Sequence, residues 1–182
     1  VEAPLAATPE NLTTAGNWGL LSAFVRDGLW YVLLHRGWDG FSVYAFDGTA
    51  FSLVTSVSGE MYGFDMSTDG KFIAARRQSI TGHYLWIFNG ATYVQTVFGA
   101  ESTASVSYRF SQDGRRLYAF SSASPYYVHA FEVTAAGLAN QRTVTHPSSI
   151  TGIVPLSGDG VLVVGAAGTG SANGGCVYQL TD

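Results

Sequence analysis

The chain has 182 residues, of which 47% are hydrophobic and 14% aromatic, so it can bury a core and is not intrinsically disordered. Its net charge of −4, with nine Lys and Arg residues, argues against a basic surface for nucleic acid. No run of about 18 apolar residues is present, so no membrane insertion is expected, and the single cysteine, Cys176, excludes an internal disulfide.

An Asp-Gly dipeptide returns four times along the chain, at intervals of 42, 44 and 46 residues. The four copies are Asp27-Gly28, Asp69-Gly70, Asp113-Gly114 and Asp159-Gly160, and three of them stand in a Ser-x-Asp-Gly frame. Each is flanked by alternating apolar residues, which is the pattern of a hairpin turn between two strands. A repeat of this length built from short strands is typical of propeller blades, so we interpret the aspartates as turn residues.

Each repeat is predicted to contain four strands. In the second unit these strands cover residues 61–67, 71–76, 84–88 and 91–98. Positions three before and four after the turn aspartate are predicted to face the core, because strand side chains alternate between two faces. They hold Phe24, Met66, Phe110 and Leu156 before the turn and Tyr31, Ile73, Leu117 and Val163 after it. A second register (aliphatic, ring, any, large apolar) marks the third strand and begins at Val43, Leu85, Val128 and Val177.

The predicted fold is all-β: a four-bladed β-propeller of four-stranded antiparallel blades, in one domain. The blades are predicted to cover residues 16–57, 58–101, 102–147 and 148–182. Asp47-Gly48 and Asn89-Gly90 predict tight turns before the fourth strand, and Ala135-Ala136-Gly137 predicts a looser one. The last unit stops after its third strand, so residues 1–8 are predicted to supply the outer strand and close the ring. Because the chain begins at Val1 and not at Met, we interpret it as a processed product or part of a longer chain.

Two stretches, residues 67–74 and 111–118, resemble the Ser-x-Asp-Gly-x-x-apolar segment of WD-repeat and WD-like propellers. The chain departs from that family because no Gly-His pair opens a repeat and no Trp-Asp pair ends the third strand. The resemblance implies the blade fold and no particular function. The degenerate, lysine-poor repeats are also similar to propeller domains of tailed-phage structural proteins, which implies a place in a virion or outside the cell.

No catalytic or metal-binding motif is found, so the sequence predicts a protein that is not an enzyme and needs no cofactor. The four histidines, His35, His83, His129 and His146, are dispersed and lack the spacing of zinc ligands. The glycine-rich residues 165–175 contain no lysine and precede a strand, so they predict a loop and not a phosphate site. A propeller-type hydrolase is disfavoured because the predicted innermost strands offer only Asp65 as an acidic residue.

The predicted function is a structural and interaction module, a subunit of a larger assembly such as a virion appendage or decoration. Its predicted contacts lie on the variable loops between the second and third strands, at Arg36, Trp38, Asp39, His83, Tyr126 and Tyr127. The alternative is a secreted or surface propeller that binds a glycan, with Trp38, Tyr84, Tyr126 and Tyr127 as stacking platforms. A further interpretation is that the outer rim makes the contacts and the loops are tolerated insertions.

Overall fold

The protein is described by a computed structural model that covers residues 19–35, 39–77, 83–98, 106–156, 160–165 and 175–179. These residues form fifteen β-strands in four antiparallel sheets and no α-helix, which confirms the predicted all-β class. Within these ranges, no helix has the length and apolar character needed to span a membrane.

Within each sheet, every strand pairs with the strand that follows it in the chain. The first sheet consists of β1 (Gly19–Arg26), β2 (Leu29–His35), β3 (Gly40–Phe46) and β4 (Phe51–Ser58). The second consists of β5 (Met61–Met66), β6 (Phe72–Arg77), β7 (His83–Phe88) and β8 (Tyr93–Phe98). The third consists of β9 (Val106–Phe110), β10 (Arg116–Ser121), β11 (Tyr127–Thr134) and β12 (Gly137–Thr145). The fourth consists of β13 (Ile150–Pro155), β14 (Gly160–Gly165) and β15 (Gly175–Gln179).

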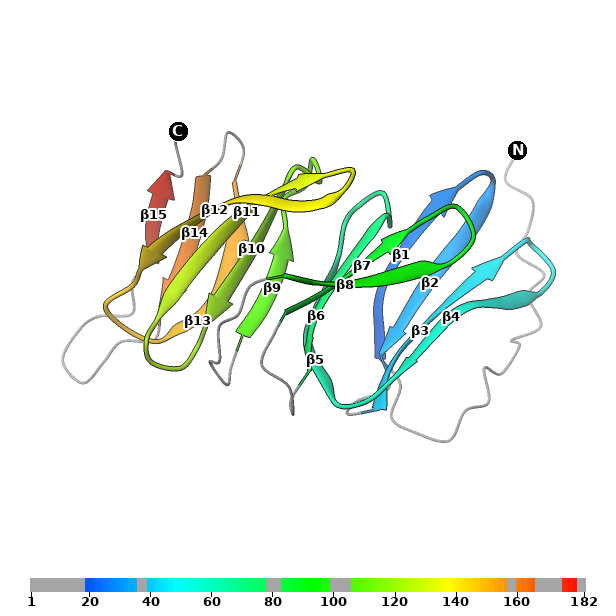
Figure 1. The fold of residues 1–182 in the computed structure, drawn as a ribbon, viewed down its shortest axis with the longest axis horizontal. Coiled ribbons are helices and arrows are strands. Elements are labelled where there is room, and N and C mark those ends of the chain that lie inside the picture. The colour runs from blue at the N-terminus through cyan, green and yellow to red at the C-terminus, as the bar shows by residue number, and fades with distance from the viewer. Residues whose placement is uncertain are drawn as a thin grey trace.

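The sheets stand side by side in chain order, with three apolar layers between them (Figure 1). The first strands lie together, since β1 contacts β5, β5 contacts β9 and β9 contacts β13. At Gly63 the approach of β5 to β9 is so close that a Cβ atom would overlap the Val106 carbonyl. The second sheet is buried on both faces, because Leu85 faces the third sheet and Trp86 faces the first. Strands enclosed in this way are apolar on both sides.

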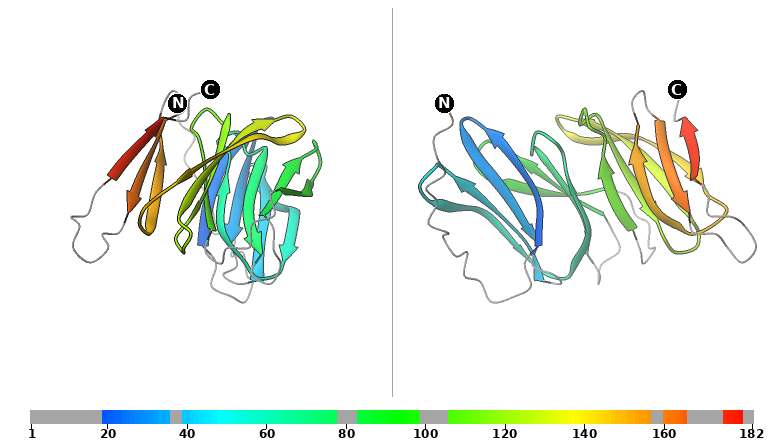
Figure 2. Two further views of the ribbon diagram at one scale, coloured as in Figure 1. Left: turned by 60° about the vertical axis from the view of Figure 1, so that its left-hand side comes forward. Right: turned by 180° about the vertical axis from the view of Figure 1, so that it is seen from behind.

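The sheets do not close into a ring. In Figure 1, and from behind in Figure 2, the first sheet and the β13–β15 sheet lie at opposite ends of the row. The prediction that one chain closes on itself is therefore wrong for the described part of the chain. The predicted closing strand, residues 1–8, lies outside the described residues. Each end sheet consequently has one face without a neighbouring sheet among the described residues.

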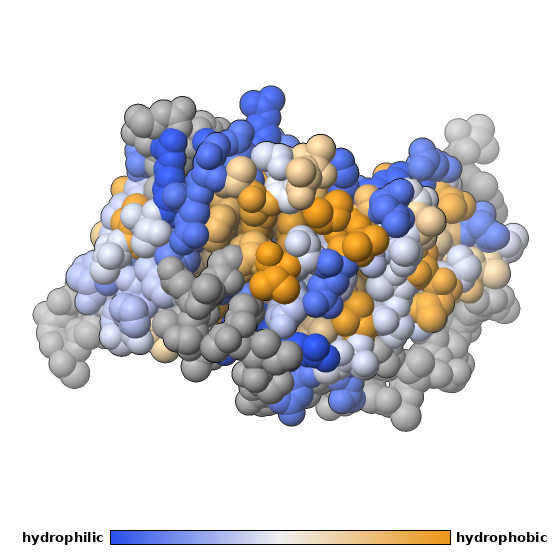
Figure 3. Space-filling model, in the orientation of Figure 1, coloured by the Kyte–Doolittle hydropathy of each residue, from blue (hydrophilic) through white to orange (hydrophobic). Residues whose placement is uncertain are grey.

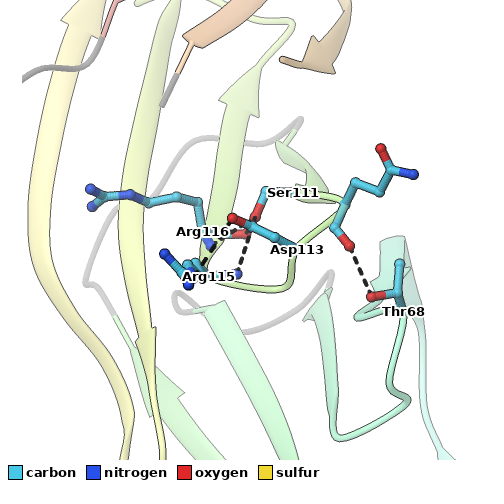
Figure 4. A network of polar contacts seen from close by, with 6 residues as sticks. Thr68, Ser111, Asp113, Arg115 and Arg116 are labelled. Carbon is cyan, nitrogen blue, oxygen red and sulfur yellow. Dashed lines mark hydrogen bonds and ion pairs between the residues drawn. The ribbon is translucent and has the colours of Figure 1, made fainter. Parts of the chain in front are cut away.

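The Ser-x-Asp-Gly turns are held by their own side chains, as Figure 4 shows for the third sheet. The Asp113 carboxylate accepts hydrogen bonds from Ser111 Oγ at 2.6 Å and from the Arg115 backbone N–H at 3.1 Å. Ser111 Oγ in turn accepts a hydrogen bond from the Arg116 N–H at 2.9 Å. The hydrogen bond from the Ser111 hydroxyl, and after it the one from the Arg115 N–H, hold the pKa of Asp113 below its ordinary value. The interpretation of the aspartates as turn residues is confirmed here.

The turns of the other sheets follow this arrangement in part. Ser67 and Asp69 repeat it in the second sheet, and Thr68 Oγ1 donates to the Gln112 carbonyl at 3.1 Å, which ties the two turns together (Figure 4). Asp27-Gly28 is instead a two-residue loop with φ of 50° and 77°, the type I′ geometry. The fourth turn, at residues 157–159, lies outside the described residues.

Most positions that were predicted to face the core are buried, and Leu156, at 39% exposed, is the exception. Tyr31 and Ile73 stand at the same distance after the turn aspartate, so they would be expected to face the same way within their sheets. Instead Tyr31 faces the following sheet and Ile73 faces the preceding one, and both lie in the layer between the first two sheets. The reason is that β2 begins directly after the turn glycine whereas β6 begins one residue later. A shift of one residue turns every following side chain to the opposite face.

The turn before β12 is tighter than the sequence predicts. Thr134 pairs with Gly137, so Ala135 and Ala136 form a two-residue turn. The Thr134 hydroxyl also donates to the Gly137 carbonyl at 2.9 Å. That side-chain bond closes the hairpin without an Asp or Asn in the turn.

Candidate interaction surface

The six residues that were predicted to contact a partner do not form one exposed surface. Arg36 and Trp38 lie outside the described residues. Asp39 is exposed, and Tyr126 is half-buried against the apolar layer between the third and fourth sheets. The other two residues, His83 and Tyr127, are buried.

His83 and Tyr127 are packing residues, because each is the first residue of a strand and points between sheets. His83 Nδ1 shares a hydrogen bond with the Tyr108 hydroxyl, and its ring stacks on Phe98 with centroids 5.3 Å apart. Burial raises the pKa of Tyr108 well above its ordinary value, so its hydroxyl remains neutral. The Tyr127 ring packs 4.1 Å from that of His129. Both predicted contact residues are therefore buried between sheets, and their side chains do not present a surface to a partner.

An apolar surface is instead exposed on the outer side of the first sheet, and we call it the β1–β4 end face. One row of it crosses all four strands, because Val25 pairs with Trp30, Trp30 with Phe46 and Phe46 with Phe51. Val25 and Trp30 are each 55% exposed. The next row consists of Ala23, Val32, Tyr44 and Leu53. Apolar residues reach the surface over this sheet, at the right of Figure 3, as well as over the middle of the molecule.

The aromatic pair in this row is held in place by the turn between its members. The rings of Phe46 and Phe51 lie with centroids 4.7 Å apart. Asp47 Oδ1 accepts hydrogen bonds from the Thr49 hydroxyl at 2.6 Å and from the N–H groups of Thr49 and Ala50 at 2.8 and 2.9 Å. These bonds, the Thr49 hydroxyl first, lower the pKa of Asp47 to about 2, so the carboxylate is charged at neutral pH. Side chains fixed before binding lose less entropy when a partner arrives.

The last sheet exposes an aliphatic surface at the opposite end, which we call the β13–β15 end face. Val154 pairs with Leu162 and Leu162 with Val177, which places the three side chains in one row. Val154 is 50% and Val177 63% exposed. Val164, at 41% exposed, and Leu156 extend this surface. Neither end face contains a charged residue among these positions.

The two end faces repeat surfaces that the middle sheets bury. Tyr44 on the β1–β4 end face stands at the third-strand position of Trp86, which is 2% exposed. Val177 stands at the position of Leu85 and Val128, which are fully buried. The repeat thus places a ring toward the preceding sheet and an aliphatic side chain toward the next one. At the two ends these side chains have no described sheet to pack against.

Asp65 links two sheets. It lies on the inner strand β5, and its Oδ2 atom accepts a hydrogen bond from the Phe110 N–H on β9 at 2.6 Å. Burial raises its pKa, and this effect outweighs the opposing hydrogen bond and the nearby Arg109 charge. Across the described ranges, no group of three or more His, Cys, Asp and Glu residues is arranged to hold a metal ion.

Comparison with solved structures identifies the architecture. A structure of Hsv2 from Kluyveromyces lactis, a β-propeller protein, matches 80% of this chain with a TM-score of 0.58 at 13% identity. The fold is that of a β-propeller. A protein from Lactobacillus plantarum matches 89% of the propeller with a TM-score of 0.52 at 16% identity. The β-propeller domain of the Trilobed protease from Pyrococcus furiosus matches 81% with a TM-score of 0.45 at 14% identity.

The propeller spans about half the length of the solved structures it matches, since 45% of the Hsv2 chain, 55% of the L. plantarum chain and 48% of the P. furiosus chain are covered. No protein-family model matches the chain, and no curated protein matches its sequence. The likenesses with TM-scores of 0.58 and 0.52 establish the fold and do not identify the function.

The end faces do not follow from the predicted strands, because each predicted strand has one inward side only. The sequence carries a signal for these faces on either side of the first turn. Phe24-Val25 and Trp30-Tyr31 are consecutive apolar residues, so both faces of these two strands carry apolar side chains. This pattern is typical of a strand that is covered on both faces. In the first sheet of a row, the same pattern leaves one face exposed.

Proposed function

We propose that this propeller is a non-enzymatic interaction module that joins a larger assembly through its end faces. The observation that carries the proposal is the row of Val25, Trp30, Phe46 and Phe51 across the β1–β4 end face. Contiguous apolar surface of this kind is typical of protein–protein contacts. Aromatic residues, and Trp foremost, contribute most of the energy of such contacts.

The proposed partners are other protein subunits with an apolar surface of their own. A charged partner group buried against Trp30 or Leu53 would lack a counter-ion there, which is unfavourable. The low content of charged residues, 12%, is consistent with a chain that is partly covered by neighbours. A virion appendage or decoration remains the proposed kind of assembly, on the strength of the resemblance of the repeats to phage structural proteins.

Glycan binding has less support than subunit contact. Of the four rings predicted as sugar platforms, Tyr84 and Tyr127 are buried and Tyr126 is half-buried. Trp38 lies outside the described residues. A glycan site requires an exposed platform of several rings. Tyr84, Tyr126 and Tyr127, the described members of the four, do not form one.

The native mass of the propeller tests the proposal. In an extract of its natural source, the tagged 19.3 kDa chain should elute in an assembly of at least two chains. Trp30→Glu places a charge in the middle of the apolar row and should shift the chain toward the monomer position. The matched control is Val97→Glu, because Val97 is 59% exposed on the outer strand β8 and belongs to neither end face.

Two results would contradict the proposal. The first is a free monomer in the extract. The second is a particle that survives Trp30→Glu and is lost with Val97→Glu, since the outer rim would then be the contact surface.

A further inference from the structure

We infer that the partner of each end face is the other end face of a second copy, so that two chains form one closed ring. This inference rests on the proposed function and names the partner. The β1–β4 end face of one copy packs on the β13–β15 end face of the other, and the same junction forms twice about a two-fold axis. Such an arrangement covers both end faces of both copies.

The junction repeats a contact that the chain already makes within itself. Between the first and second sheets, Trp86 of the second sheet packs edge-on against Phe41 with ring centroids 5.0 Å apart, and aliphatic Val43 lies in the same layer. Between copies, Tyr44 and Trp30 would supply the rings and Val177 and Val154 the aliphatic side chains. The two surfaces are thus of the two kinds that pack together inside the chain.

The end faces are also alike in charge. Every residue that defines the two surfaces is uncharged, so two copies meet without like-charge repulsion and without burying an unpaired charge. The lone large polar group among them is the phenol of Tyr44, which is half-buried already.

The share of the matched structures that one copy covers gives an independent argument. The two solved structures with TM-scores of 0.58 and 0.52 are matched over 45% and 55% of their chains. Two copies therefore supply about as much chain as one such fold contains. The row of four described sheets turns its two end faces outward, and a second copy offers each of them a surface of the complementary kind.

Light scattering of the purified chain tests this inference. The wild type should have twice the 19.3 kDa mass of the chain, and should dissociate on dilution. Loss of one hot spot weakens a junction by about thirtyfold, and loss at both junctions by about a thousandfold. Trp30→Glu and Val177→Glu should therefore each give a monomer with an unchanged circular dichroism spectrum. Val97→Glu, on the outer strand, should remain a dimer.

A mixing experiment tests which faces meet. A Trp30→Glu copy keeps an intact β13–β15 end face, and a Val177→Glu copy keeps an intact β1–β4 end face. In an equal mixture, one junction has a wild-type face on both sides, and it should hold the two copies about thirtyfold more tightly than any single junction that either variant forms alone. The circular dichroism spectra establish that both variants are folded before they are mixed. If one variant fails to fold, the mass of the other variant alone still tests the junction.

Three outcomes would overturn the inference: a wild-type monomer at the highest soluble concentration, a mass other than twice that of the chain, or a mixture that forms no dimer. The first outcome is distinct from failure of the proposed function. A purified monomer that enters a Trp30-dependent particle in its native extract is an interaction module whose partner is another protein.

Discussion

The repeat offers a direct test of what a neighbouring sheet contributes, because the same strand position is covered in one sheet and uncovered in another. Trp86 on β7 is 2% exposed between the first and second sheets and contacts Phe41 and Tyr84. Its equivalent on β3, Tyr44, is half-buried on the β1–β4 end face. Replacing a fully buried aromatic residue with alanine costs about 3 to 5 kcal/mol, because contacts are lost and a cavity remains. We expect Trp86→Ala to fall in that range.

Tyr44→Ala is the matched comparison, and we expect it to cost about 1 kcal/mol, the central value for ordinary substitutions. Urea unfolding at low protein concentration would measure both values, with equal denaturant slopes as the check on two-state behaviour. For a chain of this size, each kcal/mol corresponds to a shift of roughly 2 to 4 °C in the melting temperature. Trp86→Ala should therefore lower the melting temperature by roughly 6 to 20 °C.

Equal costs at low concentration would refute the reasoning, because Tyr44 would then be covered within the chain itself. A cost for Tyr44→Ala that grows with protein concentration would instead show that a second copy covers the β1–β4 end face. The two unfolding costs therefore test whether the β1–β4 end face is uncovered in the single chain. Their dependence on protein concentration tests whether a second copy covers it.

Three further changes test the turns, the inter-sheet contacts and the N-terminus. Ser111→Ala should cost about 1 to 2 kcal/mol in urea unfolding, since it removes the acceptor of the Arg116 N–H and a donor to Asp113, and a negligible cost would contradict this role. Asp65→Asn should stabilise the protein at neutral pH and have less effect in acid. Burial raises the folded-state pKa of Asp65, so the stability of the wild type is greatest below the unfolded pKa and falls as the pH rises through the folded pKa. A difference between the two proteins that does not change with pH would contradict it. Deletion of residues 1–8 should lower the melting temperature if they cover the edge of the last sheet, and an unchanged value would place them elsewhere.

Much of the fold could be predicted because it is local. The turn at Asp113 is determined by residues within five positions of one another, whose side chains bond to the adjacent backbone. The strands of the second sheet begin and end within two residues of their predicted bounds for the same reason. The candidate site was not predictable in this way. His83 was placed in a loop and Tyr127 in or beside one, yet both begin strands and are buried by sheets distant in sequence.

The sequence by itself determined the repeat, the antiparallel pairing and the identity of the turn residues, because hairpins and alternating faces depend on neighbours along the chain. Only the tertiary structure decided which of the two apolar faces of a sheet is buried. Trp86 and Tyr44 occupy equivalent positions in equivalent strands, and they differ because one sheet has a sheet before it and the other begins the row. Burial is a property of what packs on a surface from elsewhere in the chain, so an end face looks like a core face until the sheets are placed in space.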